Sequence, residues 1–171
     1  GMEAAPGAIM PRLQFDALLV DEVRKAPGIT LREGITLSTF ERTPSGWLAM
    51  SADNGTRIEA RLIIAADGAN SRFAKHVAGL PMEPRHHCAG VRAYFHGVQG
   101  LDPLGFIELI FLRELLPGYL WIFPLPGGRA NVGLGLRSDV AARRKADLKA
   151  LLRDLIATHP SLKYRFAHAR M

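Results

Sequence analysis

The chain of 171 residues is 48% apolar, carries a formal net charge of +6, and contains a single cysteine, Cys88. This length allows one substantial core, while the longest apolar runs fall well short of the roughly 20 residues of a transmembrane helix. A membrane-spanning helix and an intrachain disulfide are therefore excluded, and the composition favours a globular protein of the reducing cytoplasm.

Residues 12–26 place apolar side chains near helical spacing, and Pro27 and Gly28 end the predicted helix. Short strands separated by turn signals follow, and Asn54-Gly55 is a strong hairpin signal among them. These strands are expected over residues 29–31, 35–40, 47–52 and 57–60. The pattern predicts an antiparallel meander.

The next segment, Leu62–Ala66, is an unbroken apolar run that is typical of a strand covered on both faces in a parallel sheet. Asp67 stands at its carboxyl end. Gly68 can adopt a positive φ, and Asn70 or Ser71 can cap a following helix. A carboxylate, a steric gap and free helix N–H groups then lie together, as in a ligand site. The same spacing also fits an ordinary strand-to-helix turn.

Glycine and proline residues near position 81 mark a crossing into a second layer. Longer strands are expected from there, over residues 87–96, 105–112, 118–124 and 130–136, and they predict an antiparallel sheet. Tyr119, Trp121 and Phe123 alternate along one strand, so their rings share one face. That face either lines an apolar tunnel for a ligand or forms an aromatic core under the sheet.

The sequence NVGLG, residues 131–135, has a superficial likeness to a dinucleotide-binding loop, and Asp154 follows near the ribose-binding distance. Ser138 occupies the place of the third glycine of that motif. The small and apolar residues also alternate strictly, as they do in a strand with one packed face. We therefore interpret this segment as a strand.

Positive charge is concentrated at the end of the chain, because residues 137–171 carry nine basic and three acidic side chains, whereas residues 1–136 carry 13 of each. Apolar residues at helical spacing predict an amphipathic helix that begins near Ser138 and stops at His159-Pro160. A basic amphipathic helix can bind an anionic membrane surface. The alternatives are a solvated helix face and a face that meets acidic residues elsewhere.

Three segments together resemble the FAD-dependent oxidoreductases of the para-hydroxybenzoate hydroxylase fold, and among them the geranylgeranyl reductase-like family. ADGANSRFA is similar to the Asp-Gly motif of these proteins. RLQFDALL resembles their arginine-bearing helix, written Arg-x-x-Phe-Asp-x-x-Leu. GYLWIFPLPGG resembles the Tyr-x-Trp-x-Phe-Pro segment of the geranylgeranyl reductase branch. With their intervals, these segments span most of residues 10–137.

The resemblance implies a mixed α/β (α+β) fold, a fragment of a FAD/NAD(P)-binding domain with an antiparallel substrate-side sheet. Residues 10–80 would be the partial FAD-binding domain, residues 81–137 the sheet, and residues 138–171 the basic amphipathic helix and tail. The family's Gly-x-Gly-x-x-Gly pyrophosphate loop and its later Gly-Asp motif are not found in the sequence. We therefore expect an internal piece of a longer flavoprotein.

At matching positions, the resemblance implies FAD as the cofactor, with NADPH as one candidate electron donor. Arg12 would reach the phosphate or ribose side of the flavin, Asp67 would hold the cofactor region by hydrogen bonds, and Gly68 would keep the backbone close to it. The substrate would contact the aromatic face of Tyr119, Trp121 and Phe123. No catalytic acid or base and no metal site can be named.

The implied reaction is reduction of carbon–carbon double bonds in a prenyl substrate of the geranylgeranyl type, either a small molecule or a lipid-linked isoprenoid. The alternatives are an aromatic hydroxylase or monooxygenase of the same fold and a non-catalytic substrate-binding fragment. Peripheral membrane contact and a homodimer through an exposed sheet edge are further expectations. Nucleic acid is not expected as a partner, because no recognition motif accompanies the charge.

Overall fold

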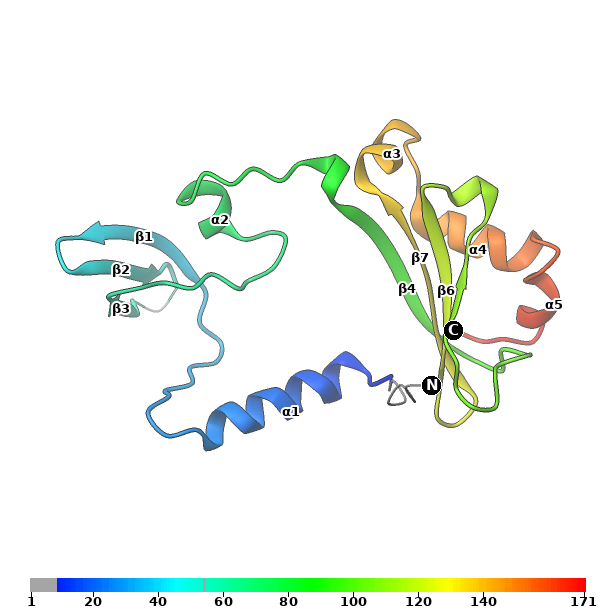
Figure 1. Cartoon of the computed structure of the whole chain (residues 1–171), viewed down its shortest axis with the longest axis horizontal. Coiled ribbons are helices and arrows are strands. Elements are labelled where there is room, and N and C mark those ends of the chain that lie inside the picture. Colours follow the sequence, from blue (N-terminus) through cyan, green and yellow to red (C-terminus); the bar gives the residue numbers. More distant parts are fainter. Residues whose placement is uncertain (1–8, 54) are drawn as a thin grey trace, which may run out of the picture. The chain divides into compact units, whose positions relative to one another are not determined.

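The computed structural model describes residues 9–53 and 55–171, which form two compact units divided between Met82 and Glu83 (Figure 1). Each unit is described by itself. The Asn54-Gly55 hairpin signal includes Asn54, which lies outside the described residues. In the described part of the chain, no helix has the length and apolar character needed to cross a membrane.

The first unit begins with α1 (Arg12–Lys25), which matches the helix predicted from apolar spacing. None of its residues is buried, and its apolar side chains Leu13, Leu18 and Leu19 are exposed. The helix is instead lined by ion pairs one turn apart, including Lys25 with Glu22. Exposed pairs of this kind contribute little to stability.

An antiparallel meander of three strands follows: β1 (Leu37–Thr43), β2 (Gly46–Ser51) and β3 (Arg57–Ala60), in the order β1-β2-β3. The predicted strand at residues 29–31 does not form. The short helix α2 (Arg72–His76) contributes Phe73, whose ring meets Phe40 edge-on at 4.9 Å and Trp47 at 5.5 Å between centroids. This aromatic cluster anchors α2 to the meander.

The prediction of a buried strand over Leu62–Ala66 is wrong. The segment is extended but joins no sheet among the described residues, and Leu62 and Ile64 are 71% and 84% exposed. A buried parallel strand needs a neighbouring strand on each side and a cover on both faces. The strands of this unit pair only within the meander. The apolar run therefore has the residue types of a strand, but no neighbouring strand pairs with it among the described residues.

The second unit contains the expected antiparallel sheet. Its strands are β4 (Cys88–His96), β5 (Glu108–Ile110), β6 (Gly118–Leu125) and β7 (Arg129–Arg137), in the order β4-β7-β6-β5. Short 3-10 turns, Pro84–His86 and Arg113–Leu115, precede β4 and β6. The interpretation of NVGLG as a strand is confirmed, because these residues lie within β7, the strand between β4 and β6.

The predicted single helix from Ser138 to His159 is also corrected, because the structure has α3 (Ser138–Arg143) and α4 (Leu148–Thr158), followed by α5 (Lys163–Phe166). Lys145, between α3 and α4, has a positive φ of 47° that interrupts the helix. Ser138 makes no side-chain cap, whereas the Asp147 carboxylate accepts hydrogen bonds from the N–H groups of Lys149 and Ala150. A new helix therefore starts after Asp147.

One face of the sheet packs against the helices and forms the core of the second unit. This core consists mainly of alternate strand residues that meet the apolar side of α4 and the segment around α5. Its buried members include Phe95, Leu115, Leu120, Ile122, Val132, Leu134, Leu152, Leu155, Leu162 and Phe166. The segment 138–171 therefore belongs to the same compact unit as the sheet.

Candidate functional site

The opposite face of the sheet carries a row of aromatic side chains, which we call the aromatic ladder: Phe111, Tyr119, Trp121 and Phe123. Successive ring centroids are 5.7, 6.0 and 6.1 Å apart. The intervening residues of β6, Leu120 and Ile122, point into the core and are fully buried. The three predicted substrate-side rings therefore share one face, on the side of the sheet away from the core. The rings therefore lie outside the helix-covered core.

Glycines on the neighbouring strands form the floor under the ladder. Trp121 pairs with Gly133 of β7, and Tyr119 pairs with Gly135. A Cβ added to Gly133 would collide with the indole of Trp121, and one added to Gly90 or Gly135 would lie 3.9 or 3.8 Å from the same ring. The indole therefore lies flat across β7 toward β4.

A polar contact holds the same ring at its edge. The indole Nε1–H of Trp121 donates a hydrogen bond to Oδ1 of Asn131, with 3.0 Å between N and O. Asn131 lies opposite Phe123 in the register of β6 and β7. Sequence reasoning missed Asn131 and Gly133, because the alternation along β7 predicts their face but not which residue of β6 lies beside them.

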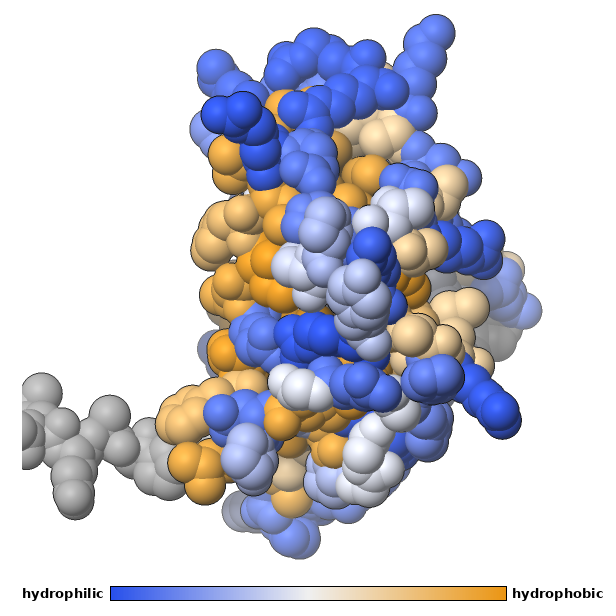
Figure 2. Space-filling view, turned by 90° about the vertical axis from the view of Figure 1, so that its right-hand side faces the viewer, coloured by the Kyte–Doolittle hydropathy of each residue, from blue (hydrophilic) through white to orange (hydrophobic). Residues whose placement is uncertain are grey.

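Exposed apolar residues continue from the ladder along the edge of the sheet at β5. They lie on or beside this strand between residues 104 and 116: Leu104, Phe106, Ile107, Leu109, Phe111 and Leu116. Figure 2, which looks onto the side where α4 and α5 lie in Figure 1, shows hydrophobic surface gathered in a column along one side of the view. The second unit thus combines an aromatic face with an apolar edge.

The predicted cofactor residues Asp67 and Gly68 lie in the first unit at the turn before α2. Gly68 has a φ of +86°, and a Cβ built on it would meet nothing within 4 Å. This conformation favours glycine and leaves the backbone open to close approach. Ser71, one of the two predicted caps, accepts a hydrogen bond from the N–H of Ala74 at 3.0 Å.

Asp67 also lines an apolar cavity of about 420 Å³. Phe40 and Phe73 close part of this cavity, and the segment 63–66 forms another wall. Asp67 itself is exposed and makes no hydrogen bond or ion pair that the structure records within residues 9–53 and 55–171. A carboxylate at the rim of an apolar cavity can accept hydrogen bonds from the hydroxyls of a ligand.

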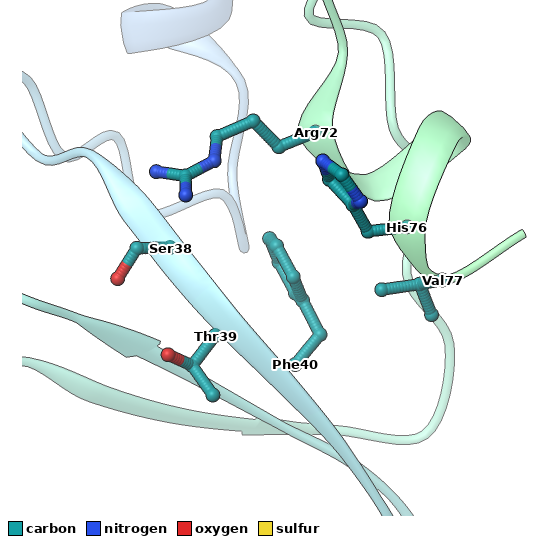
Figure 3. Close-up of a pocket in the computed structure, with 6 residues that line it drawn as sticks. All are labelled: Ser38, Thr39, Phe40, Arg72, His76 and Val77. Atoms are coloured by element: carbon teal, nitrogen blue, oxygen red, sulfur yellow. The ribbon is translucent and has the colours of Figure 1, made fainter.

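A second cavity, of about 330 Å³, is also lined by Phe40 and lies between residues of β1 and α2 (Figure 3). Figure 3 shows that the Arg72 side chain extends from α2 toward Ser38 of β1, while the His76 ring stays beside α2. Arg72 has no ion-pair partner in the described part of the chain. Its guanidinium and the neighbouring hydroxyls are donors of the kind that bind anionic groups. The residue was not singled out from the sequence, although it directly follows the Ser71 cap.

Arg12, the third predicted cofactor residue, is the first residue of α1 and is paired within its own helix. Its guanidinium donates two hydrogen bonds to the Asp16 carboxylate, at 2.9 and 3.0 Å. This bonding, reinforced by the charge of Asp16, raises the pKa of Arg12. No hydrogen bond or ion pair among the described residues joins Arg12 to the Asp67 turn. The role of Arg12 toward a cofactor stays a prediction.

No group of three or more His, Cys, Asp or Glu side chains among residues 9–53 and 55–171 is arranged to hold a metal ion.

Comparison with curated proteins finds relatives over most of the chain, while no family model matches. The chain is 35% identical over 143 residues to digeranylgeranylglycerophospholipid reductase 2 of Methanothermobacter thermautotrophicus. The matched region covers 81% of this chain and 36% of that protein. It is 30% identical over 165 residues to menaquinone reductase of Mycobacterium tuberculosis, covering 92% of this chain and 38% of the relative. The chain thus spans less than two fifths of the length of these relatives.

Comparison with solved structures identifies the fold. A geranylgeranyl bacteriochlorophyll reductase-like protein of Thermoplasma acidophilum matches with a TM-score of 0.68 and 23% identity, covering 98% of this chain and 42% of that one. The flavin-dependent halogenase CmlS matches with a TM-score of 0.70 and 21% identity, covering 93% of this chain and 29% of that one. At these identities the likeness shows that the chain has part of the fold of flavin-dependent enzymes.

Proposed function

Because this chain belongs to the geranylgeranyl reductase-like family of FAD-dependent oxidoreductases, we propose that it is part of an enzyme that reduces carbon–carbon double bonds of a prenyl substrate. The observation that carries the proposal is the 35% identity over 143 residues to a digeranylgeranylglycerophospholipid reductase. The aromatic ladder supports it, because an apolar face of alternating rings suits a hydrocarbon chain. A lipid-linked isoprenoid or the prenyl tail of a quinone fits the names of the relatives.

In this proposal the ladder binds and orients the prenyl chain. Tyr119, Trp121 and Phe123 offer ring faces along one side of β6, and their rings exclude water from the double bond they contact. The part assigned to the ladder in this proposal is therefore binding and orientation of the substrate.

The residues of the first unit fit the cofactor by their donor chemistry. The Asp67 carboxylate suits ribose hydroxyls, the open backbone at Gly68 permits close approach, and the Arg12 guanidinium suits phosphate oxygens. FAD, when bound and reduced, would supply the hydride for the reduction. We propose NADPH as the source of that hydride.

A hydroxylase or monooxygenase remains the second candidate, together with a non-catalytic substrate-binding fragment. The halogenase structures share the fold at 16–21% identity, which supports the architecture without the chemistry. The curated relatives, at 30–35% identity, are named reductases. This difference favours reduction.

Two partner proposals accompany this function. Lys149 and Arg153 are exposed on α4, which supports peripheral contact with an anionic membrane that holds the substrate. The exposed edge strand β5, with its apolar neighbours, supports a homodimer formed through this edge.

Titration of the purified chain with FAD tests the cofactor assignment. We expect saturable binding, followed by quenching of flavin fluorescence, and a clear loss of affinity for Asp67→Ala because the carboxylate that accepts ligand hydroxyls is removed. Asp53→Ala, at another exposed aspartate of the same unit, is the matched control and should bind as the unchanged chain does. Equal binding by Asp67→Ala would refute the role of Asp67.

Assays of the full-length gene product distinguish the reductase from the hydroxylase. Saturation of a prenyl substrate under anaerobic conditions with reduced FAD supports the reductase. Oxygen consumption with an aromatic substrate, in the absence of prenyl reduction, would overturn it.

A further inference from the structure

The hydrogen bond from Trp121 to Asn131 keeps the indole N–H paired when an apolar ligand covers this face. An indole N–H is a donor only, so the Asn131 amide must present its oxygen to it, as the 3.0 Å contact shows. Without that acceptor, the N–H would be bonded to water. A hydrocarbon chain that covered the ring would then displace the water and leave the donor unpaired, which is costly.

Gly133 provides the space in which the held ring lies. A Cβ at this position would collide with both the indole of Trp121 and the carbonyl oxygen of Val91. Gly135, two residues along β7, would accept a Cβ at 3.8 Å from the same indole, which is an ordinary contact. The flat orientation of Trp121 therefore depends on one glycine of the strand much more than on the other.

We propose that Asn131 is a positioning residue that fixes the plane of the Trp121 indole and satisfies its N–H, so that a prenyl chain can cover the ring without leaving an unpaired donor. Gly133 is the companion residue that lets the ring lie flat between Tyr119 and Phe123. This inference rests on the proposed function, because it takes the ladder as the prenyl-binding face.

The test uses the whole chain with Trp47→Phe, which leaves Trp121 as the single tryptophan of the two in the sequence. In the ¹H–¹⁵N spectrum, the one indole N–H signal is expected downfield in this background. We expect it to move upfield in Asn131→Leu, which has no acceptor, and to stay downfield in Asn131→Asp, which keeps one. A purely structural role for Asn131 would not produce this rescue by aspartate.

Binding is then measured with farnesol, a short prenyl alcohol, through the fluorescence of Trp121. We expect Asn131→Leu to bind about tenfold more weakly, the size expected for one unpaired donor, and Asn131→Asp to recover most of the affinity. Gly133→Ala should weaken binding as well, and by more than Gly135→Ala, whose added Cβ would stay at an ordinary contact distance of 3.8 Å from the indole. Circular dichroism confirms that each variant is folded, and Asn131→Ala replaces any leucine variant that is not.

The outcomes separate this inference from the proposed function. Binding of farnesol by Asn131→Leu with unchanged affinity would overturn the inference and leave the prenyl-binding face intact. Failure of the unsubstituted chain to bind farnesol would overturn both.

Discussion

Asp147 defines the start of α4 through its own side chain. Its carboxylate accepts hydrogen bonds from the N–H groups of Lys149 and Ala150, at 2.9 and 3.0 Å. The bond from Ala150 is the largest of the effects that hold the pKa of Asp147 below its ordinary value of 3.8. The charged form is thus favoured in the folded state, because only that form accepts both bonds fully.

Asp147→Ala should lower the melting temperature at pH 7 by about 2–4 °C, the usual effect of losing a helix cap in a chain of this size. Because the folded pKa is depressed, the contribution of the carboxylate is fully present above pH 3.8 and is lost as the pH falls through the lower folded value. The difference in melting temperature between the unsubstituted protein and Asp147→Ala should therefore become smaller in acid. Melting curves between pH 7 and pH 2.5 check this.

Asp147→Ser is the matched control, since a serine can cap the helix but does not titrate in this range. Its melting temperature relative to Asp147→Ala should not converge at low pH. A pH-independent difference between Asp147 and Ala would contradict the role given to the carboxylate.

Individual site residues were predictable only where a local pattern carries the information. Tyr119, Trp121 and Phe123 share a face, as their alternation in the sequence predicted. The contact between Asn131 and Trp121 was not predicted, because the two residues are ten positions apart and lie on different strands. The pairing of β6 with β7 depends on the turn that joins them and on the core beneath, and neither can be read from one strand.

Between elements, a bidentate ion pair in the second unit joins α5 to the edge strand β5. Arg165 donates hydrogen bonds to both carboxylate oxygens of Glu108 at 2.7 Å, and others to the carbonyl oxygens of Gln99 and Gly100. The Arg165 and Glu108 side chains are only 19% and 32% exposed. A bidentate pair in this setting is stronger than a pair on the open surface.

Arg165→Ala should therefore destabilise the protein by about 2 kcal/mol, because a partly buried carboxylate and two carbonyl groups lose their donor. Arg165→Lys should recover only part of this, since an ammonium group cannot make the same fork of bonds. Urea denaturation gives the free energies of unfolding. Arg85→Ala, which breaks the exposed pair with Glu83 in the same unit, is the control and should cost less than about 0.5 kcal/mol. Equal costs for the two alanine variants would contradict this view.

Most helices and strands could be predicted from periodicity and turn residues, and the exceptions have physical causes. The run Leu62–Ala66 has strand-forming residues, but strand formation needs partners that the meander does not supply. The single helix expected from Ser138 became two, because the local cap at Asp147 and the positive φ of Lys145 prevail over the continuous apolar spacing. Spacing alone does not show where a helix pauses.

Considered as a whole, the molecule distributes its buried apolar residues unevenly between its two units. Among the described residues from 10 to 82, the buried side chains are Leu48, Ala49 and Ser71. The core of residues 83–171 contains 13 buried residues drawn from the sheet and helices. Stability follows buried apolar area, so the second unit should be the more stable one.

A shortened chain of residues 83–171 is therefore expected to fold alone and to unfold cooperatively, with the near-ultraviolet signal of Trp121 retained. Residues 10–82 alone should show a weak and broad transition, because three buried residues cannot offset the chain entropy. Thermal circular dichroism of both pieces checks this. A cooperative transition for residues 10–82, with none for residues 83–171, would reverse the assignment.

The position of β7 between β4 and β6 also limits how far its sequence can change. Val132, Leu134 and Leu136 are fully buried against the core, and Gly133 lies beneath the Trp121 ring on the other face. Successive positions of the strand are thus constrained from opposite sides. In a library that samples every substitution, residues 132–136 should tolerate the fewest replacements. A variant that gains a new substrate would arise more easily from changes in the exposed neighbours of the ladder than from changes in β7.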